Sequence, residues 1–309
     1  MGFAGMMSQY WCETNPHKGA VMTEPKTYPL DAPGAVLHYD VRSNDASSEP
    51  VLLLIGSPMG ASGFVTLAGH FTDRTVVTYD PRGAGRSKRT DGALRTETEE
   101  QADDLHRLIL ALDAGPVDIF GSSGGAVNGL ALVARHPEQV RILVAHEPPS
   151  AQVLPDREAV LAACEGIHET YLRKGFGPAM AKFIVLVSYA GPIPAGFAGQ
   201  PGPDPASFGL PAEDDGSRDD PLLGLNMPAT PSYEHDFDAL RAASTRIVVG
   251  VGAQSAEMMA GRGGVGVAGR LGTAPVTFPG GHDGFLGGEY GGMGEPDAFA
   301  ATLRGVLTG

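Results

Sequence analysis

The sequence has few cysteines and few basic residues. Its two cysteines, Cys12 and Cys164, lie far apart and without CxxC spacing. This argues against a disulfide framework or a zinc ribbon and favours a reducing, cytoplasmic location. The 22 Lys and Arg residues are outnumbered by 36 Asp and Glu residues, which gives a formal net charge of -14. Because so acidic a surface repels phosphate backbones and anionic lipid headgroups, we expect neither a nucleic-acid nor a membrane partner.

Long apolar runs are also missing. No stretch of 18 apolar residues occurs, so no transmembrane helix is predicted. Residues 1–25 lack the basic start and the apolar segment of a secretory signal, and we interpret them as an N-terminal extension. This extension holds the single tryptophan, Trp11. Its candidate packing partners are its own domain and a second copy of the chain, so a homodimer stays open.

Short apolar runs alternate with helical patterns along most of the chain. Residues 96–115 show the clearest helical pattern, because Leu105, Leu108, Ile109 and Leu112 share one face. Continuously apolar runs of this length suit a parallel sheet covered on both faces. The alternation predicts an α/β fold with a doubly wound, mostly parallel sheet. The predicted strands, preceded by a hairpin over 26–42, are 51–57, 75–80, 117–123, 141–147, 246–252 and 275–281.

The alternation stops between residues 150 and 233. Two helical patterns come first there, and a segment rich in Gly, Pro and Asp follows. Because strand patterns resume afterwards, we interpret 150–233 as a lid or cap insertion into a core of residues 26–149 and 234–309. Five apolar residues of the insertion are candidates for the lining of a substrate pocket, although packing within the lid explains them equally well: Phe176, Met180, Phe183, Ile184 and Leu186.

The segment Gly121-Ser122-Ser123-Gly124-Gly125 lies between a predicted strand and a predicted helix. A serine is a good nucleophile only where a base, a sharp turn and donors for the developing charge assist it. In such a turn the residues two before and two after the nucleophile come close together, so both must be small. Glycines occupy these positions around Ser123, whereas Phe120 would stand two before Ser122. The pattern therefore favours Ser123.

With this GxSxG turn the chain resembles the α/β-hydrolase fold family, in topology over residues 26 to 307. The segment "YDPRGAGRS" (79–87) is similar to the family's loop after the preceding strand, where Asp80 and Arg82 would be structural. The resemblance implies a catalytic histidine after the last strand, and His282 stands there in "PGGHDGF". Three other histidines are interpreted as structural: His106, His136 and His168.

The acid of the triad has two candidate places in the resembled family. The usual place, after the strand 246–252, falls near Ser255, which holds no charge, with Glu257 two residues further on. The other place is the end of the strand after the nucleophile helix, where Glu147 stands before two prolines. Ligands bind at the carboxyl edge of such sheets. We therefore favour Glu147, with Glu257 as the alternative and a helix-capping role for Glu147 as the non-catalytic interpretation.

The resemblance also implies two backbone donors for the oxyanion. One is the N–H of Gly124, at the start of a helix whose dipole adds to the effect. The other comes from the loop "IGSPMG" (55–60), where Ser57 is the expected donor, although Ile55 replaces the usual histidine.

These residues predict a serine hydrolase that cleaves an ester-like bond of a small, apolar substrate: a carboxylesterase, lactonase or thioesterase. No cofactor or metal is expected, since no zinc-ligand spacing occurs. Perhydrolase (haloperoxidase-like) or lyase activity on the same triad is one alternative. A non-catalytic ligand-binding protein is the other, favoured by the uncharged Ser255.

Overall fold

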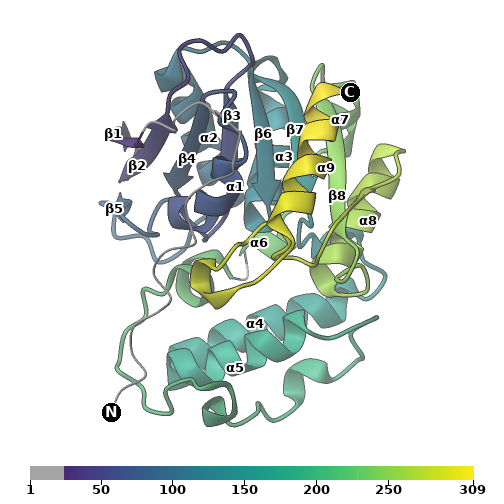
Figure 1. Ribbon diagram of the computed structural model, residues 1–309. Coiled ribbons are helices and arrows are strands. Elements are labelled where there is room, and N and C mark those ends of the chain that lie inside the picture. Colours follow the sequence, from purple (N-terminus) through teal and green to yellow (C-terminus); the bar gives the residue numbers. More distant parts are fainter. Residues whose placement is uncertain (1–23, 228) are drawn as a thin grey trace, which may run out of the picture.

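The computed structural model describes residues 24–227 and 229–309, so the predicted extension with Trp11 lies largely outside the described residues. A single mixed sheet forms the centre of the molecule (Figure 1). Its strands are β1 (Lys26–Ala32), β2 (Ala35–Arg42), β3 (Leu52–Ile55), β4 (Val76–Asp80), β5 (Lys88–Arg89), β6 (Val117–Ser122), β7 (Val140–His146), β8 (Arg246–Gly252) and β9 (Val276–Phe278).

The strand order is β1-β2-β4-β3-β6-β7-β8-β9, and β5 pairs with β2. The pairs from β4 to β9 are parallel, whereas β1 and β2 form the predicted antiparallel hairpin. The last strand is shorter than the predicted 275–281. It ends at Phe278, because Pro279 has no N–H to donate and Gly280 has a φ of 77°.

Helices cover both faces of the sheet, which makes the fold a doubly wound α/β fold. The helices are α1 (Val65–Gly69), α2 (Thr98–Leu112), α3 (Gly124–Arg135), α4 (Arg157–Lys174), α5 (Phe176–Val187), α6 (Ala229–Ser232), α7 (Phe237–Ala242), α8 (Met259–Leu271) and α9 (Pro296–Thr308). Among the described residues, no helix is long and apolar enough to span a bilayer.

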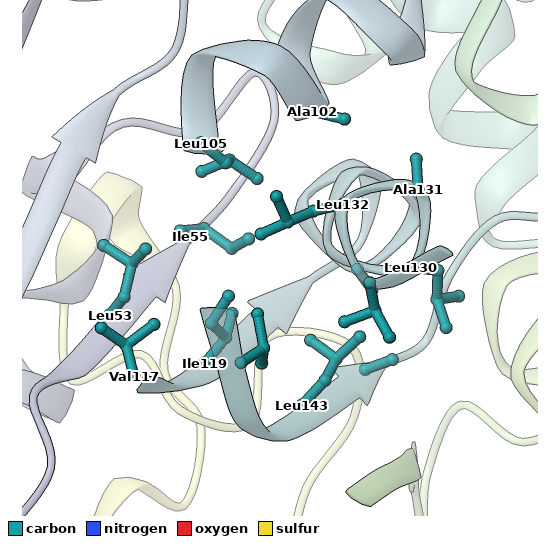
Figure 2. Packing of buried hydrophobic residues seen from close by; sticks show 14 of the residues in the cluster. Leu53, Ile55, Ala102, Leu105, Val117, Ile119, Leu130, Ala131, Leu132 and Leu143 are labelled. Atoms are coloured by element: carbon teal, nitrogen blue, oxygen red, sulfur yellow. The ribbon is translucent and has the colours of Figure 1, made fainter. Parts of the chain in front are cut away.

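Successive strand residues point to opposite faces of the sheet, so one strand contributes side chains to two hydrophobic cores. On β3, Leu53 and Ile55 pack against α2 and α3, and Leu52 and Leu54 pack against α1 and α9. Figure 2 shows the first core, in which side chains of α2 and α3 meet those of β3, β6 and β7. This layered packing fixes the strand ends that carry the candidate site.

Helices α4 and α5 lie outside these two layers, beyond the ends of the strands (Figure 1). They pack on each other around a third apolar cluster that includes Ile167, Tyr171 and Leu186. The chain between α5 and α6 makes only short helical turns, the last of which is Pro221–Asn226. The many Gly, Pro and Asp residues of this stretch explain why it forms no long element.

Candidate active site

Ser123 stands at the sharp turn between β6 and α3. Its φ of 56° and ψ of -124° are strained for a residue with a side chain. A Cβ on Gly121 would lie 2.8 Å from the carbonyl oxygen of Gly125, so the turn requires glycine at this crossing. The Ser123 N–H donates to the carbonyl of His146 on β7 at 2.9 Å. Ser123 lines a cavity, whereas Ser122 is buried within β6.

Glu147 follows β7 directly and lies beside His282. Its Oε2 is 2.6 Å from Nδ1 of His282. Its Oε1 accepts a hydrogen bond from the Ser255 hydroxyl at 2.5 Å and another from the Gly252 N–H at 2.8 Å. The φ of Glu147 is 48°, so the backbone is strained at this residue as well as at Ser123.

The surroundings of Glu147 favour its ionised form. Burial alone would raise the pKa of this carboxyl. The hydrogen bond and charge of His282 and the hydrogen bond of Ser255 outweigh burial and lower the pKa to about 2. Glu147 is therefore a carboxylate at neutral pH, held at both oxygens and directed at the imidazole.

The other acid candidate lies elsewhere. The side chain of Glu257 is exposed, and its backbone carbonyl accepts a hydrogen bond from the Gly191 N–H. Ser255 fills the slot after β8 and bonds to Glu147. Sequence reasoning gave Ser255 no role, because nothing in the chain between the two residues shows that they meet.

The cavity that contains Ser123 and His282 has a volume of about 470 Å³. This is within the usual size of small-molecule sites. Apolar side chains make much of its wall: Pro149, Phe183, Val187, Leu222, Met227, Pro231, Met258 and Met259. Of the five predicted lining residues of the insertion, Phe183 alone is among those that line this cavity. Phe176, Met180 and Leu186 pack within the cluster of α4 and α5 instead.

The loop with Ser57 lies against the start of α3. A Cβ on Gly124 would come within 2.4 Å of the Ser57 carbonyl oxygen, so the two backbones touch beside Ser123. Both residues line the cavity. An N–H group in the first turn of a helix has no partner within the helix, so Gly124 has a donor to offer.

The remaining predicted residues have structural contacts. Arg82 is buried and forms a two-bond ion pair with Asp104, and Asp80 accepts a hydrogen bond from the Ala61 N–H. The rings of His106 and His136 stack at 3.9 Å. Within the described residues, no three His, Cys, Asp or Glu side chains gather closely enough to hold a metal ion.

Comparison with known proteins places this geometry in a family. A family described as "alpha/beta hydrolase fold" matches residues 49–184. An uncharacterized hydrolase, YraK of Bacillus subtilis, is 32% identical over 262 residues, which cover 83% of this chain and 89% of that protein. The chain belongs to the α/β-hydrolase fold family and is a hydrolase.

Solved structures agree with this fold. An enol-lactonase from Burkholderia xenovorans matches with a TM-score of 0.62 and 18% identity, over 91% of this chain and all of that one. A thermophilic esterase from Thermogutta terrifontis matches with a TM-score of 0.63 and 20% identity, over 93% of this chain and 98% of that one. At these identities the likeness extends to the fold alone.

Proposed function

We propose that the protein is a serine esterase whose catalytic residues are Ser123, His282 and Glu147. The observation that carries the proposal is the 2.6 Å contact between Glu147 Oε2 and His282 Nδ1, in the cavity that Ser123 lines from a strained turn. This contact leaves Nε2 of His282 for the proton of the serine hydroxyl. The contact also gives His282 a charged partner. A non-catalytic binding protein was considered because Ser255, at the usual position of the acid, carries no charge.

The reaction follows from these roles. Ser123 Oγ attacks the ester carbonyl while His282 Nε2 takes its proton, and the carboxylate of Glu147 stabilises the imidazolium. The negative oxygen of the tetrahedral intermediate accepts hydrogen bonds from the N–H groups of Ser57 and Gly124. As the alcohol leaves, His282 returns the proton to it. Water then attacks the acyl-enzyme by the same route and releases the acid.

The cavity wall favours an acyl group that is apolar and uncharged. Methionine, proline and other apolar side chains dominate the lining. No Lys or Arg is among the described residues that line it, whereas the carboxylates of Glu147 and Asp283 are. A substrate carboxylate would lose its hydration there without gaining a cation. We therefore propose that the substrates are esters of uncharged acids. Lactones and thioesters whose anionic groups would lie against this wall are not expected to be substrates.

Two substitutions test the nucleophile. Ser123→Ala should lower ester turnover by about 10⁶-fold, since triad members act as a unit. Ser122→Ala, one position earlier in the same turn, is the matched control and should keep most of the activity. A fluorophosphonate should label the wild type at Ser123. Full activity in Ser123→Ala would reject the proposal, and peroxide-dependent halide oxidation without ester hydrolysis would favour the perhydrolase alternative.

A matched pair of esters tests the charge preference. p-Nitrophenyl pentanoate and the p-nitrophenyl monoester of glutaric acid have acyl chains of equal length, but only the second carries a carboxylate. Since an unpaired buried charge costs several kcal/mol, we expect kcat/KM for the neutral ester to be at least about 10²-fold higher. Equal values would show that the wall does not select against charge.

A further inference from the structure

A buried polar network holds the side chain of Ser57. The Ser57 hydroxyl donates to Gln101 Oε1 at 2.8 Å and lies 3.2 Å from Asn226 Oδ1. Gln101 Nε2 donates to Asn226 Oδ1 at 2.8 Å, and Asn128 Nδ2 donates to Gln101 Oε1 at 3.0 Å. All four side chains are more than nine-tenths buried. They form one connected set in which Gln101 is the central member.

The four residues come from four separate parts of the chain. Gln101 is in the first turns of α2, and its neighbour Ala102 contributes to the core in Figure 2. Asn128 is on α3, five residues after the nucleophile. Asn226 ends the short helical turn between α5 and α6, and its Nδ2 donates to the Pro221 carbonyl at 2.6 Å. The network thus ties the Ser57 loop to both helices and to the inserted segment.

Stability alone does not explain this arrangement. Asn128 Oδ1 is buried and has no hydrogen-bond partner among the described residues. An unpaired buried acceptor costs free energy, and apolar side chains of the same shape would avoid that cost. A set of amides that fixes one loop in one geometry is therefore better explained by what that loop must hold in place.

We propose that Gln101, Asn128 and Asn226 are positioning residues for the oxyanion site. Through the Ser57 side chain they hold the Ser57 backbone N–H in the place where the transition-state oxygen needs a donor. The inference rests on the proposed esterase function. It gives the Ser57 side chain a role that a backbone donor would not need, and it makes a residue of the inserted segment part of the catalytic geometry. Asn226 also lines the cavity, so this segment borders both the cavity and the Ser57 loop.

The test uses the full-length chain with Ser57→Ala, Gln101→Met and the double variant. Ser57→Ala keeps the backbone N–H and removes only the anchor, and Gln101→Met keeps the side-chain length and removes only the hydrogen bonds. Gln139→Met is the matched control, because Gln139 is also buried and hydrogen-bonded, to His106, away from the cavity. The measurements are kcat and KM on p-nitrophenyl pentanoate, the affinity of a trifluoromethyl ketone that forms an oxyanion, and thermal unfolding.

Displacement of a catalytic group by about 1 Å from a distant change lowers the rate by about 10²-fold. We expect each single variant to lose about 10- to 100-fold in kcat with KM changed less than about threefold, and to lose ketone affinity in parallel. The double variant should lose little more than the worse single one, because both changes release the same loop. Gln139→Met should keep wild-type kcat.

Three results would overturn the proposal: unchanged kcat in both single variants, losses that fall in KM alone, or losses that multiply in the double variant. If Gln101→Met fails to fold, Ser57→Ala still decides, since it removes one hydroxyl. Fluorophosphonate labelling separates this inference from the proposed function. A wild type that neither hydrolyses esters nor reacts at Ser123 rejects the function, whereas normal labelling of both wild type and variants together with unchanged kcat rejects the positioning role alone.

Discussion

The ends of β7 and β8 lie side by side in the sheet but contribute to the site in different ways. At the end of β7 come His146 and Glu147, and at the end of β8 comes glycine-rich backbone. Glu147 donates its own N–H to the Gly250 carbonyl and accepts the N–H of Gly252. One strand end thus supplies the carboxylate, and the other supplies the backbone and the Ser255 hydroxyl that hold it.

The glycines of β8 are required by this arrangement. A Cβ on Gly250 would lie 2.7 Å from a ring carbon of Phe278 and 3.2 Å from the ring of His146. A Cβ on Gly252 would lie 2.6 Å from the Ser255 hydroxyl oxygen. The end of β8 is therefore packed closely against Phe278, His146 and Ser255, and it contributes backbone groups and the Ser255 hydroxyl rather than a carboxylate.

The largest effect is expected from replacing His282, whose imidazole contacts Glu147. His282→Ala should lower kcat by about 10⁶-fold, because base and nucleophile share one step. Steady-state kinetics and thermal unfolding measure this. A loss below about tenfold in a folded variant would remove His282 from the mechanism and make the comparison of strand ends irrelevant to catalysis.

The next effect distinguishes the two acids. Glu147→Gln keeps the volume but removes the charge, so kcat should fall by about 10⁴-fold. Glu257→Gln is the matched control and should stay within about tenfold of the wild type, because that side chain is exposed. The reverse pattern would assign the acid to Glu257, in the segment after β8. If neither substitution matters, the site works as a Ser–His pair or only binds.

A smaller effect is expected from moving the acid between the strands. Ser255→Asp places a carboxylate next to residue 147, because the Ser255 hydroxyl oxygen lies 2.5 Å from Glu147 Oε1. In the background of Glu147→Gln it should restore about tenfold or more of the lost kcat, since one charge–imidazole contact returns. Ser255→Asn in the same background carries no charge and is the control. Equal activity of Asp and Asn variants would show that His282 responds only to the end of β7.

The smallest effect concerns stability at acid pH and compares His146, the last residue of β7, with Glu147, which follows it. His146 is fully buried among Phe120, Phe278, Phe285 and Phe299, and its ring nitrogens have no hydrogen-bond partner among the described residues. Burial lowers the pKa of His146 from 6.5 to about 3. The unfolded chain therefore binds a proton that the folded one does not, and stability falls as the pH drops below 6.5.

Glu147 acts in the same direction at lower pH. Its pKa is lowered from 4.5 to about 2, so its stabilising contribution is present above pH 4.5 and is lost as the pH falls toward 2. Each group contributes a slope of about 1.4 kcal/mol per pH unit within its range. Urea unfolding measures the free energy of unfolding at each pH. Between pH 6.5 and 4.5, this free energy should fall less per pH unit for His146→Phe than for the wild type. Identical slopes would mean that the imidazole is not held neutral by burial.

Much of the architecture follows from local pattern. The apolar runs predicted β3, β4, β6, β7 and β8 to within a few residues, because a strand buried on both faces must be apolar throughout. The acidic start and leucine face of 96–115 predicted α2, which spans Thr98–Leu112. Only one frame of glycines fits the turn at Ser123, and the structure shows that turn, with Gly121 and Gly125 in close contact.

Contacts between distant segments decided the rest. The sequence by itself left Glu147 and Glu257 as alternatives, because nothing local states which carboxylate reaches a histidine 135 residues away, as Glu147 does. It gave no sign that Ser255 would donate to Glu147, or that Asn226 would meet Gln101 across 125 residues. The periodicity of apolar residues and the chemistry of turns act over a few residues, and they determine the individual helices and strands. Which polar side chains meet is set only when the sheet and residues 150–233 pack, since each buried polar group then has to find its partner across the fold.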